Sequence, residues 1–152
     1  MTRRLILWLT TVTVLLWLCA AGIGLLACSL LMVNNLRDIH TDPAHGKMTL
    51  AVRLGETRAR IAFVLLLTLP LLLGVAALGW LFFADGGAVM SLTQVLVIVV
   101  FVGVLTVFVD RAAKPVMRGA SGRELIPVLR DAGLTELVYG VALAVALVVL
   151  SR

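Results

Sequence analysis

The feature that most constrains the fold is a long apolar segment near the start of the chain, because no side chain from Leu5 to Val33 carries a charge. As an α-helix this segment would measure about 44 Å at ~1.5 Å per residue, which exceeds the roughly 30 Å hydrocarbon core of a bilayer. Of all 152 residues, 62% are hydrophobic and only 14% are charged, against about 25% charged residues in soluble domains. The sequence therefore predicts an integral membrane protein.

Three later apolar segments predict further membrane helices. The four expected spans are residues 5–33, 61–83, 92–109 and 134–150. Pro70 predicts a kink in the second span. The first span is longer than the ~7–15-residue apolar core of a signal peptide, so we expect it to be retained as a membrane helix. The fold class is therefore an all-α integral membrane protein, with residues 1–152 in a single membrane domain.

Basic residues gather in two of the segments between these spans. They are Arg37, Lys47, Arg53, Arg58 and Arg60 in loop 34–60, and Arg111, Lys114, Arg118, Arg123 and Arg130 in loop 110–133. Loop 84–91 has none, so the positive-inside rule predicts that both basic loops lie in the cytosol. Arg3 and Arg4 oppose this orientation, because basic residues ahead of a first span usually hold it inside. The conflict would vanish if further spans preceded this chain.

The net charge of +5 follows from these loops, and no aromatic-interleaved basic patch indicates nucleic-acid binding. Within the second basic loop, Ser121 and Glu124 have the spacing of a capping box. We expect a short helix lying on the membrane here, ending at Gly133 before the fourth span. Two interpretations of this loop stay open: an ordinary interfacial connector, and a lid over a site that faces the cytosol.

Polar residues follow the first span at once, in the stretch "NNLRDIHTDPAHGK" at residues 34–47. Asn34, Asp38 and Asp42 are spaced i, i+4 and i+8, which on a continuing helix places them on one face. Pro43 disfavours helical geometry at Asp42, so we expect the helix to end there, with Asp42 at an exposed lip. Two carboxylates and an amide are hard oxygen ligands of the kind that suit Mg²⁺ rather than zinc.

The cations near these carboxylates favour a diphosphate ligand. Lys47 and Arg53 follow on the same side of the predicted membrane, and Arg37 lies among the acids. Carboxylates that hold Mg²⁺, with Lys and Arg beside them, form a receptor for diphosphate. The alternative is a solvated loop whose acids and bases pair with one another and whose basic residues serve only membrane topology.

The stretch "NNLRDIHTDPAHGKMTLAVRLGETRAR" at residues 34–60 resembles the second aspartate-rich motif of the 1,4-dihydroxy-2-naphthoate prenyltransferases, which belong to the UbiA superfamily. "PVLRDAGL" at residues 127–134 resembles the end of bacterial members. The resemblance implies a bundle of nine transmembrane helices with a cytosol-facing active site, of which this chain would supply the last four. By motif position it implies that the Mg²⁺ ligands are Asn34, Asp38 and Asp42, of which Asp38 and Asp42 would be catalytic. The further diphosphate-binding residues would be Asn35, Arg37, Lys47 and Arg53.

The function implied by the resemblance is transfer of a polyprenyl group from polyprenyl diphosphate to 1,4-dihydroxy-2-naphthoate, with decarboxylation, in menaquinone biosynthesis at the bacterial cell membrane. The family's first motif, of the "NDxxDxxxD" kind, is missing from this sequence. We therefore expect an incomplete half or subunit, completed by a separate N-terminal half. The alternatives are a non-catalytic membrane protein that binds prenyl diphosphate or acts as a scaffold, and a small four-span transporter. A transporter would place its coupling acid at mid-membrane rather than at a helix end.

Overall fold

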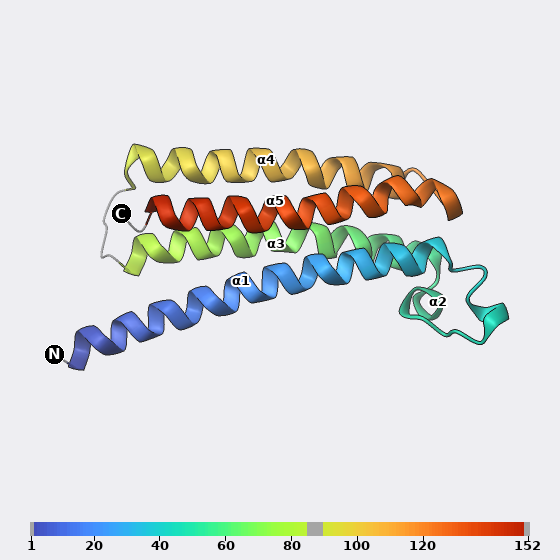
Figure 1. The fold of residues 1–152 in the computed structure, drawn as a ribbon, viewed down its shortest axis with the longest axis horizontal. Coiled ribbons are helices and arrows are strands. Elements are labelled where there is room, and N and C mark those ends of the chain that lie inside the picture. Colours follow the sequence, from blue (N-terminus) through green and yellow to red (C-terminus); the bar gives the residue numbers. More distant parts are fainter. Residues whose placement is uncertain (1, 85–89, 151–152) are drawn as a thin grey trace.

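The computed structural model describes residues 2–84 and 90–150, which are helical apart from short connections (Figure 1). The long helices are α1 (Thr2–Arg37), α3 (Glu56–Ala84), α4 (Leu92–Met117) and α5 (Ile126–Leu150). The short helices are η1 (Pro43–His45), α2 (Leu50–Leu54) and η2 (Gly122–Leu125). No strand occurs in this part of the chain. The predicted loop 84–91 falls mostly on residues 85–89, which lie outside the described residues.

Within the described residues, four helices are long and apolar enough to cross a membrane, which confirms the predicted all-α fold with four such helices. The observed helices run beyond the predicted spans, and α3, for example, begins at Glu56 rather than at residue 61. The added residues, "ETRAR", are mostly good helix formers. Helical structure therefore continues past the point where the hydropathy falls. α3 also continues as one helix through Pro70.

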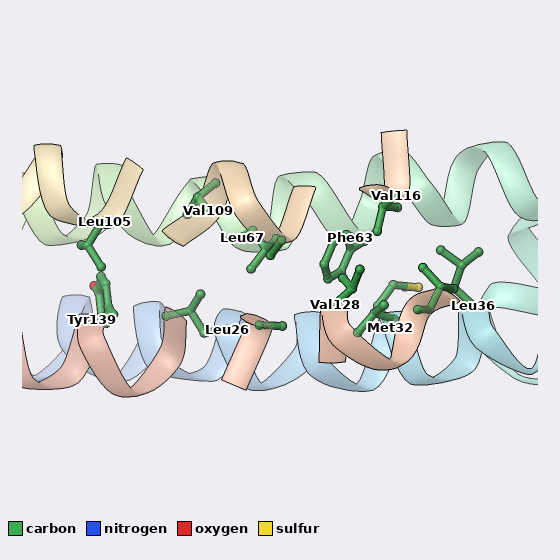
Figure 2. Packing of buried hydrophobic residues seen from close by; sticks show 14 of the residues in the cluster. Leu26, Met32, Leu36, Phe63, Leu67, Leu105, Val109, Val116, Val128 and Tyr139 are labelled. Atoms are coloured by element: carbon green, nitrogen blue, oxygen red, sulfur yellow. The ribbon is translucent and has the colours of Figure 1, made fainter. Parts of the chain in front are cut away.

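The core lies along the line where the four long helices meet. α1 packs mainly on α3, and α4 packs mainly on α5. Figure 2 shows Leu26 and Met32 of α1, Phe63 of α3 and Tyr139 of α5 in the buried cluster. Figure 1 shows the N-terminal half of α1 leaning away from the other three helices, and Trp17 in that half is 73% exposed. The packed part of α1 is therefore its second half, which leads into the polar stretch at residues 34–47.

Two corrections to the sequence-based expectations concern helix ends. The short membrane-surface helix expected at residues 125–133 does not end at Gly133, because α5 runs without interruption from Ile126 to Leu150. Pro127 lies in its first turn, where a missing backbone N–H costs nothing. The other correction concerns α1, which ends at Arg37 and not at Asp42. Asp42 nevertheless adopts helical dihedral angles (φ −55°, ψ −45°) directly before Pro43.

The capping box expected at Ser121 and Glu124 is present. The Ser121 backbone N–H donates to the Glu124 carboxylate at 3.2 Å, and the Glu124 N–H donates to the Ser121 carbonyl at 3.0 Å. Leu125 is fully buried beside this turn. The connection between α4 and α5 is therefore an ordered turn anchored in the core.

Candidate functional site

The two asparagines at the end of α1 face different neighbours. Consecutive residues on a helix are separated by about 100°, so Asn34 and Asn35 cannot point the same way. Asn34 lines a groove that includes Leu129 of α5. Asn35 lines a separate pocket with Leu50 of α2 and Leu66 of α3. Of the two predicted site residues, Asn34 therefore lies on the side of α5, and Asn35 lies on the side of α2 and α3.

Asp38 directly follows α1 and forms a two-pronged ion pair with Arg37. Arg37 Nε donates to Asp38 Oδ1 at 2.8 Å, and Arg37 Nη2 donates to Asp38 Oδ2 at 2.6 Å. Both side chains are about one-third exposed, at 32% and 35%. The hydrogen bonds from Arg37 hold the pKa of Asp38 below its usual range, against a smaller opposing effect of desolvation. Asp38 is therefore a carboxylate at neutral pH, in contact with both protein and solvent.

Asp38 lines a pocket between the two loops, 34–60 and 110–133, that the sequence predicts to be cytosolic. Arg37, Asp38 and Thr41 form one wall of this pocket, and Gly122, Arg123 and Ile126 form the other. Its volume is about 350 Å³. The connector between α4 and α5 thus forms part of the pocket that contains the carboxylate singled out from the sequence. The Asp38 side chain is still 35% exposed, so both interpretations of this loop, a connector and a lid, stay open.

Asp42 is placed differently from the expectation of an exposed lip, since the residue is only 7% exposed. Its carboxylate Oδ1 lies 4.0 Å from Lys47 Nζ. The backbone N–H groups of His45 and Lys47 both donate to the Asp42 carbonyl, at 3.1 and 2.9 Å. The chain reverses over Asp42 here, helped by Gly46, whose φ of 73° suits a glycine. This reversal buries Asp42 and brings Lys47 back beside it.

Lys47 and Arg53 are both exposed. Arg53 lies on α2, which begins at Leu50. Thr49 caps this helix, and its side chain accepts a hydrogen bond from the Val52 N–H at 3.4 Å. Among the described residues Arg53 has no ion-pair partner, whereas Lys47 lies beside Asp42. Both cations are therefore open to an anion arriving from solvent.

The donor chemistry of this site fits Mg²⁺ only if the metal is shared with a ligand. Nowhere in residues 2–84 and 90–150 do three His, Cys, Asp or Glu side chains come close enough to hold a metal by themselves. Mg²⁺ commonly takes one or two protein carboxylates and completes its shell with water and phosphate oxygens. Asp38 can offer such an oxygen, although both of its oxygens are now bonded to Arg37. Metal bound at Asp38 would therefore share or compete for these oxygens with Arg37.

Arg60, near the start of α3, connects the polar loop to the second connector. Its Nη1 donates to the Val116 carbonyl at 2.5 Å, and its Nη2 donates to the Gly119 carbonyl at 3.3 Å. The same guanidinium pairs with Glu56, whose other oxygen lies 3.7 Å from His40 Nε2. From the sequence alone, Arg60 indicates only membrane topology. The hydrogen bonds of Arg60 join residues 56 and 59 positions apart, and the local sequence carries no signal for such contacts.

Comparison with known proteins identifies a family for this chain. Residues 4–118 match the model of the UbiA prenyltransferase family. The chain is 45% identical over 128 residues to a 1,4-dihydroxy-2-naphthoate octaprenyltransferase of Mycobacterium tuberculosis (strain ATCC 25618 / H37Rv), a match that covers 84% of this chain and 39% of that protein. It is 34% identical over 131 residues to the protein of the same name from Haemophilus influenzae (strain ATCC 51907 / DSM 11121 / KW20 / Rd), covering 86% of this chain and 38% of that protein. No solved structure matches. The chain thus spans about two fifths of the length of these relatives.

Proposed function

The chain belongs to the UbiA prenyltransferase family, and we propose that it supplies one wall of a Mg²⁺-dependent polyprenyltransferase active site. The reaction would transfer a polyprenyl group from polyprenyl diphosphate to 1,4-dihydroxy-2-naphthoate, which loses its carboxylate as carbon dioxide, as a step of menaquinone biosynthesis. The names of the relatives support this choice of substrates. The protein would lie in the bacterial cell membrane, with residues 34–60 and 110–133 on the cytosolic side.

The observation that carries the proposal is the position of Asp38. It directly follows a helix that is long and apolar enough to span a membrane, and it lines a pocket open to solvent. A prenyl diphosphate has a charged head and a long apolar tail. A pocket with a carboxylate and an arginine at the end of a membrane helix suits both parts of this molecule. The charged head can stay in water while the tail lies along the apolar helices.

The polar residues divide into metal ligands and phosphate-binding residues in this proposal. Asn34, Asp38 and Asp42 would hold Mg²⁺, which when bound would neutralise negative charge on the diphosphate. The cations Arg37, Lys47 and Arg53 would donate hydrogen bonds to the phosphate oxygens as the carbon–oxygen bond breaks and charge develops on the leaving group. Asn35 would contribute a weaker polar contact from the opposite side of α1.

The apolar helices would hold the prenyl chain and protect the reaction intermediate. They bind the prenyl chain and keep water away from the allylic cation until the naphthoate ring attacks it. The middle of each predicted span carries no acid, and Asp38 lies beyond the end of α1. This arrangement argues against a transporter, whose coupling acid belongs at mid-membrane.

The length of the relatives bears on how the site is completed. They are more than twice as long as the matched segment, so further helices would complete the site. We propose that these helices carry the first aspartate-rich motif, whether on the same polypeptide or on a separate N-terminal half. The facing motif would then supply the metal ligands that the described residues do not bring together.

The test is product formation in membranes supplied with Mg²⁺, 1,4-dihydroxy-2-naphthoate and a polyprenyl diphosphate. The chain is expressed alone and together with the segment of the Mycobacterium tuberculosis relative that lies outside the matched region. We expect prenylated product, detected by mass spectrometry, only on co-expression. Asp38→Asn should reduce the rate at least a hundredfold, because it removes a charge that acts on the metal–diphosphate.

Asp110→Asn is the matched control, since Asp110 is a partly exposed carboxylate paired with Lys114 on α4. It should leave the rate within twofold of the unaltered chain. Full activity of the Asp38→Asn variant would refute the proposed role of this site.

A further inference from the structure

We propose that Arg123, on the connector between α4 and α5, is a further diphosphate-binding residue of this site. The inference rests on the proposed function and extends it to a loop outside the aspartate-rich motif. Arg123 lies in η2 and lines the same pocket as Asp38, from the opposite wall. The ligand would be the diphosphate head of the prenyl donor.

The charge balance of the pocket favours an anion. Arg37 and Asp38 satisfy each other through two hydrogen bonds, so together they add no net charge. Arg123 is exposed, and its side chain forms no ion pair with any residue that the structure describes. The pocket walls therefore carry one unpaired positive charge. Binding of Mg²⁺ to Asp38 would free Arg37 as well, which would leave two guanidinium groups for the phosphate oxygens.

The connector is built to hold Arg123 in place. On one side, Arg60 donates to the carbonyls of Val116 and Gly119. On the other side, Leu125 is fully buried, and Glu124 closes the turn by accepting from the Ser121 N–H. An arginine that serves only membrane topology has to lie on the cytosolic side, but it needs no ordered position there. The ordered backbone of the connector, which brings Arg123 to the same pocket as Asp38, is a further property that a binding role explains.

Diphosphate suits this pocket better than the carboxylate of the aromatic acceptor does. Arginine presents several N–H donors in a planar fork, and the clustered oxygens of a diphosphate can accept from two such groups at once. Asp38 would repel a bare carboxylate, whereas a diphosphate would reach Asp38 through the metal. The connector would therefore act on the leaving group.

The test measures binding directly, so that it does not depend on turnover. The chain is reconstituted in lipid nanodiscs with the complementary segment of the Mycobacterium tuberculosis relative. Inorganic diphosphate is titrated in the presence of Mg²⁺ by calorimetry. We expect Arg123→Gln to weaken binding about tenfold, the loss typical of a charge-assisted hydrogen bond at a partly exposed site. Arg123→Lys, which retains the charge, should weaken binding by no more than about threefold.

Arg118→Gln is the matched control, because it removes the same charge from an exposed position at the end of α4 that is not among the residues lining the pocket. It should bind inorganic diphosphate within about twofold of the unaltered chain. A loss as large as that of Arg123→Gln would show that only the total charge of the loop matters, which would overturn the inference.

One further variant and one further probe separate this inference from the proposed function. If Asp38→Asn loses diphosphate binding while Arg123→Gln binds normally, the proposed function stands and the role of Arg123 is wrong. If Asp38→Asn also binds diphosphate normally, both the proposed function and the proposed role of Arg123 are wrong. 1-Hydroxy-2-naphthoate serves as a second probe for the acceptor. Weaker binding of this probe alone in Arg123→Gln would assign Arg123 to the carboxylate and overturn the inference.

Discussion

The guanidinium of Arg60 donates a hydrogen bond of 2.5 Å to the carbonyl oxygen of Val116, joining the start of α3 to the end of α4. The side chain of Arg60 is only 12% exposed, and it also pairs with Glu56 on its own helix. The last carbonyls of a helix have no partners within that helix, so a donor from a neighbour stabilises the end. This contact fixes the connector on which Arg123 is carried.

Replacing Arg60 by methionine should therefore loosen the connector. The variant keeps the apolar stem but loses the donors, so we expect the free energy of unfolding in detergent to fall by about 1–3 kcal/mol. Hydrogen exchange at residues 117–125 should become faster, while exchange in the middle of α4 should not change. Arg58→Met is the control, because Arg58 is exposed on the same helix. Equal protection of the connector in both variants would show that Arg60 does not hold it.

Close packing around Tyr139 predicts a different sensitivity. A Cβ atom at Gly22 would lie 2.9 Å from Tyr139 Cζ and closer still to its hydroxyl oxygen. Gly22→Ala should thus force α1 and α5 apart and cost about 1–3 kcal/mol of stability, as overpacking does. Gly24→Ala is the matched control two residues away, since a Cβ there meets nothing within 4 Å. It should be neutral or slightly stabilising. Thermal unfolding in detergent compares the two, and equal midpoints would contradict this packing.

The hydroxyl of Tyr139 is itself a source of instability. It is buried and has no hydrogen-bond partner among the described residues. A buried polar group without a partner carries an uncompensated desolvation cost, so Tyr139→Phe should raise the free energy of unfolding by about 1 kcal/mol. Tyr139→Ala removes the ring as well and should lower stability by about 3–5 kcal/mol. A destabilised Tyr139→Phe variant would mean that the hydroxyl has a partner in the membrane.

The sequence predicted the elements of this fold better than their ends. Long uncharged runs admit only membrane helices, so the four spans could be predicted directly. The end of α1 could not, because Asp42 keeps helical dihedral angles before Pro43 while the chain already reverses through Gly46. The continuity of α5 could not be predicted either, because Gly133 is a typical helix-ending residue and yet lies inside this helix. In a membrane helix, packing and the lack of water for the backbone outweigh the low helix propensity of one glycine.

The candidate site was predictable in its chemistry and only partly in its geometry. The spacing of Asn34 and Asp38 correctly puts both residues at the membrane-helix end, because Asn34 lies in the last turn of α1 and Asp38 directly follows that helix. A shared face is not evident, since the two residues line different pockets. Burial of Asp42 depends on a local chain reversal, which a spacing argument does not contain. Arg123 reaches the pocket through a connector that is held by contacts across α3 and α4. Such long-range placement follows from packing, and the residues near Arg123 in sequence do not encode it.

The ion pair of Asp38 with Arg37 gives a prediction for pH dependence. Arg37 lowers the pKa of the Asp38 carboxyl, so the folded protein holds this carboxylate ionised more firmly than the unfolded chain does. A lowered pKa contributes stability above the unfolded value of about 3.9, and that contribution is lost as the pH falls through the lower folded value. Between pH 5 and 8 the pair should therefore make a constant contribution. Because both side chains are about one-third exposed, that contribution is small.

The direct measurement is a carboxyl ¹³C titration of the chain in detergent without Mg²⁺. The Asp38 resonance, assigned by its disappearance in Asp38→Asn, should titrate below the ordinary aspartate range. In Arg37→Gln the midpoint should rise toward that range, because the two hydrogen bonds from the guanidinium are gone. Arg53→Gln removes a cation from α2 that does not touch Asp38 and should leave the midpoint unchanged. An ordinary midpoint that Arg37→Gln does not move would mean that this pair does not persist in solution, and Asp38 would then be free to bind metal without displacing Arg37.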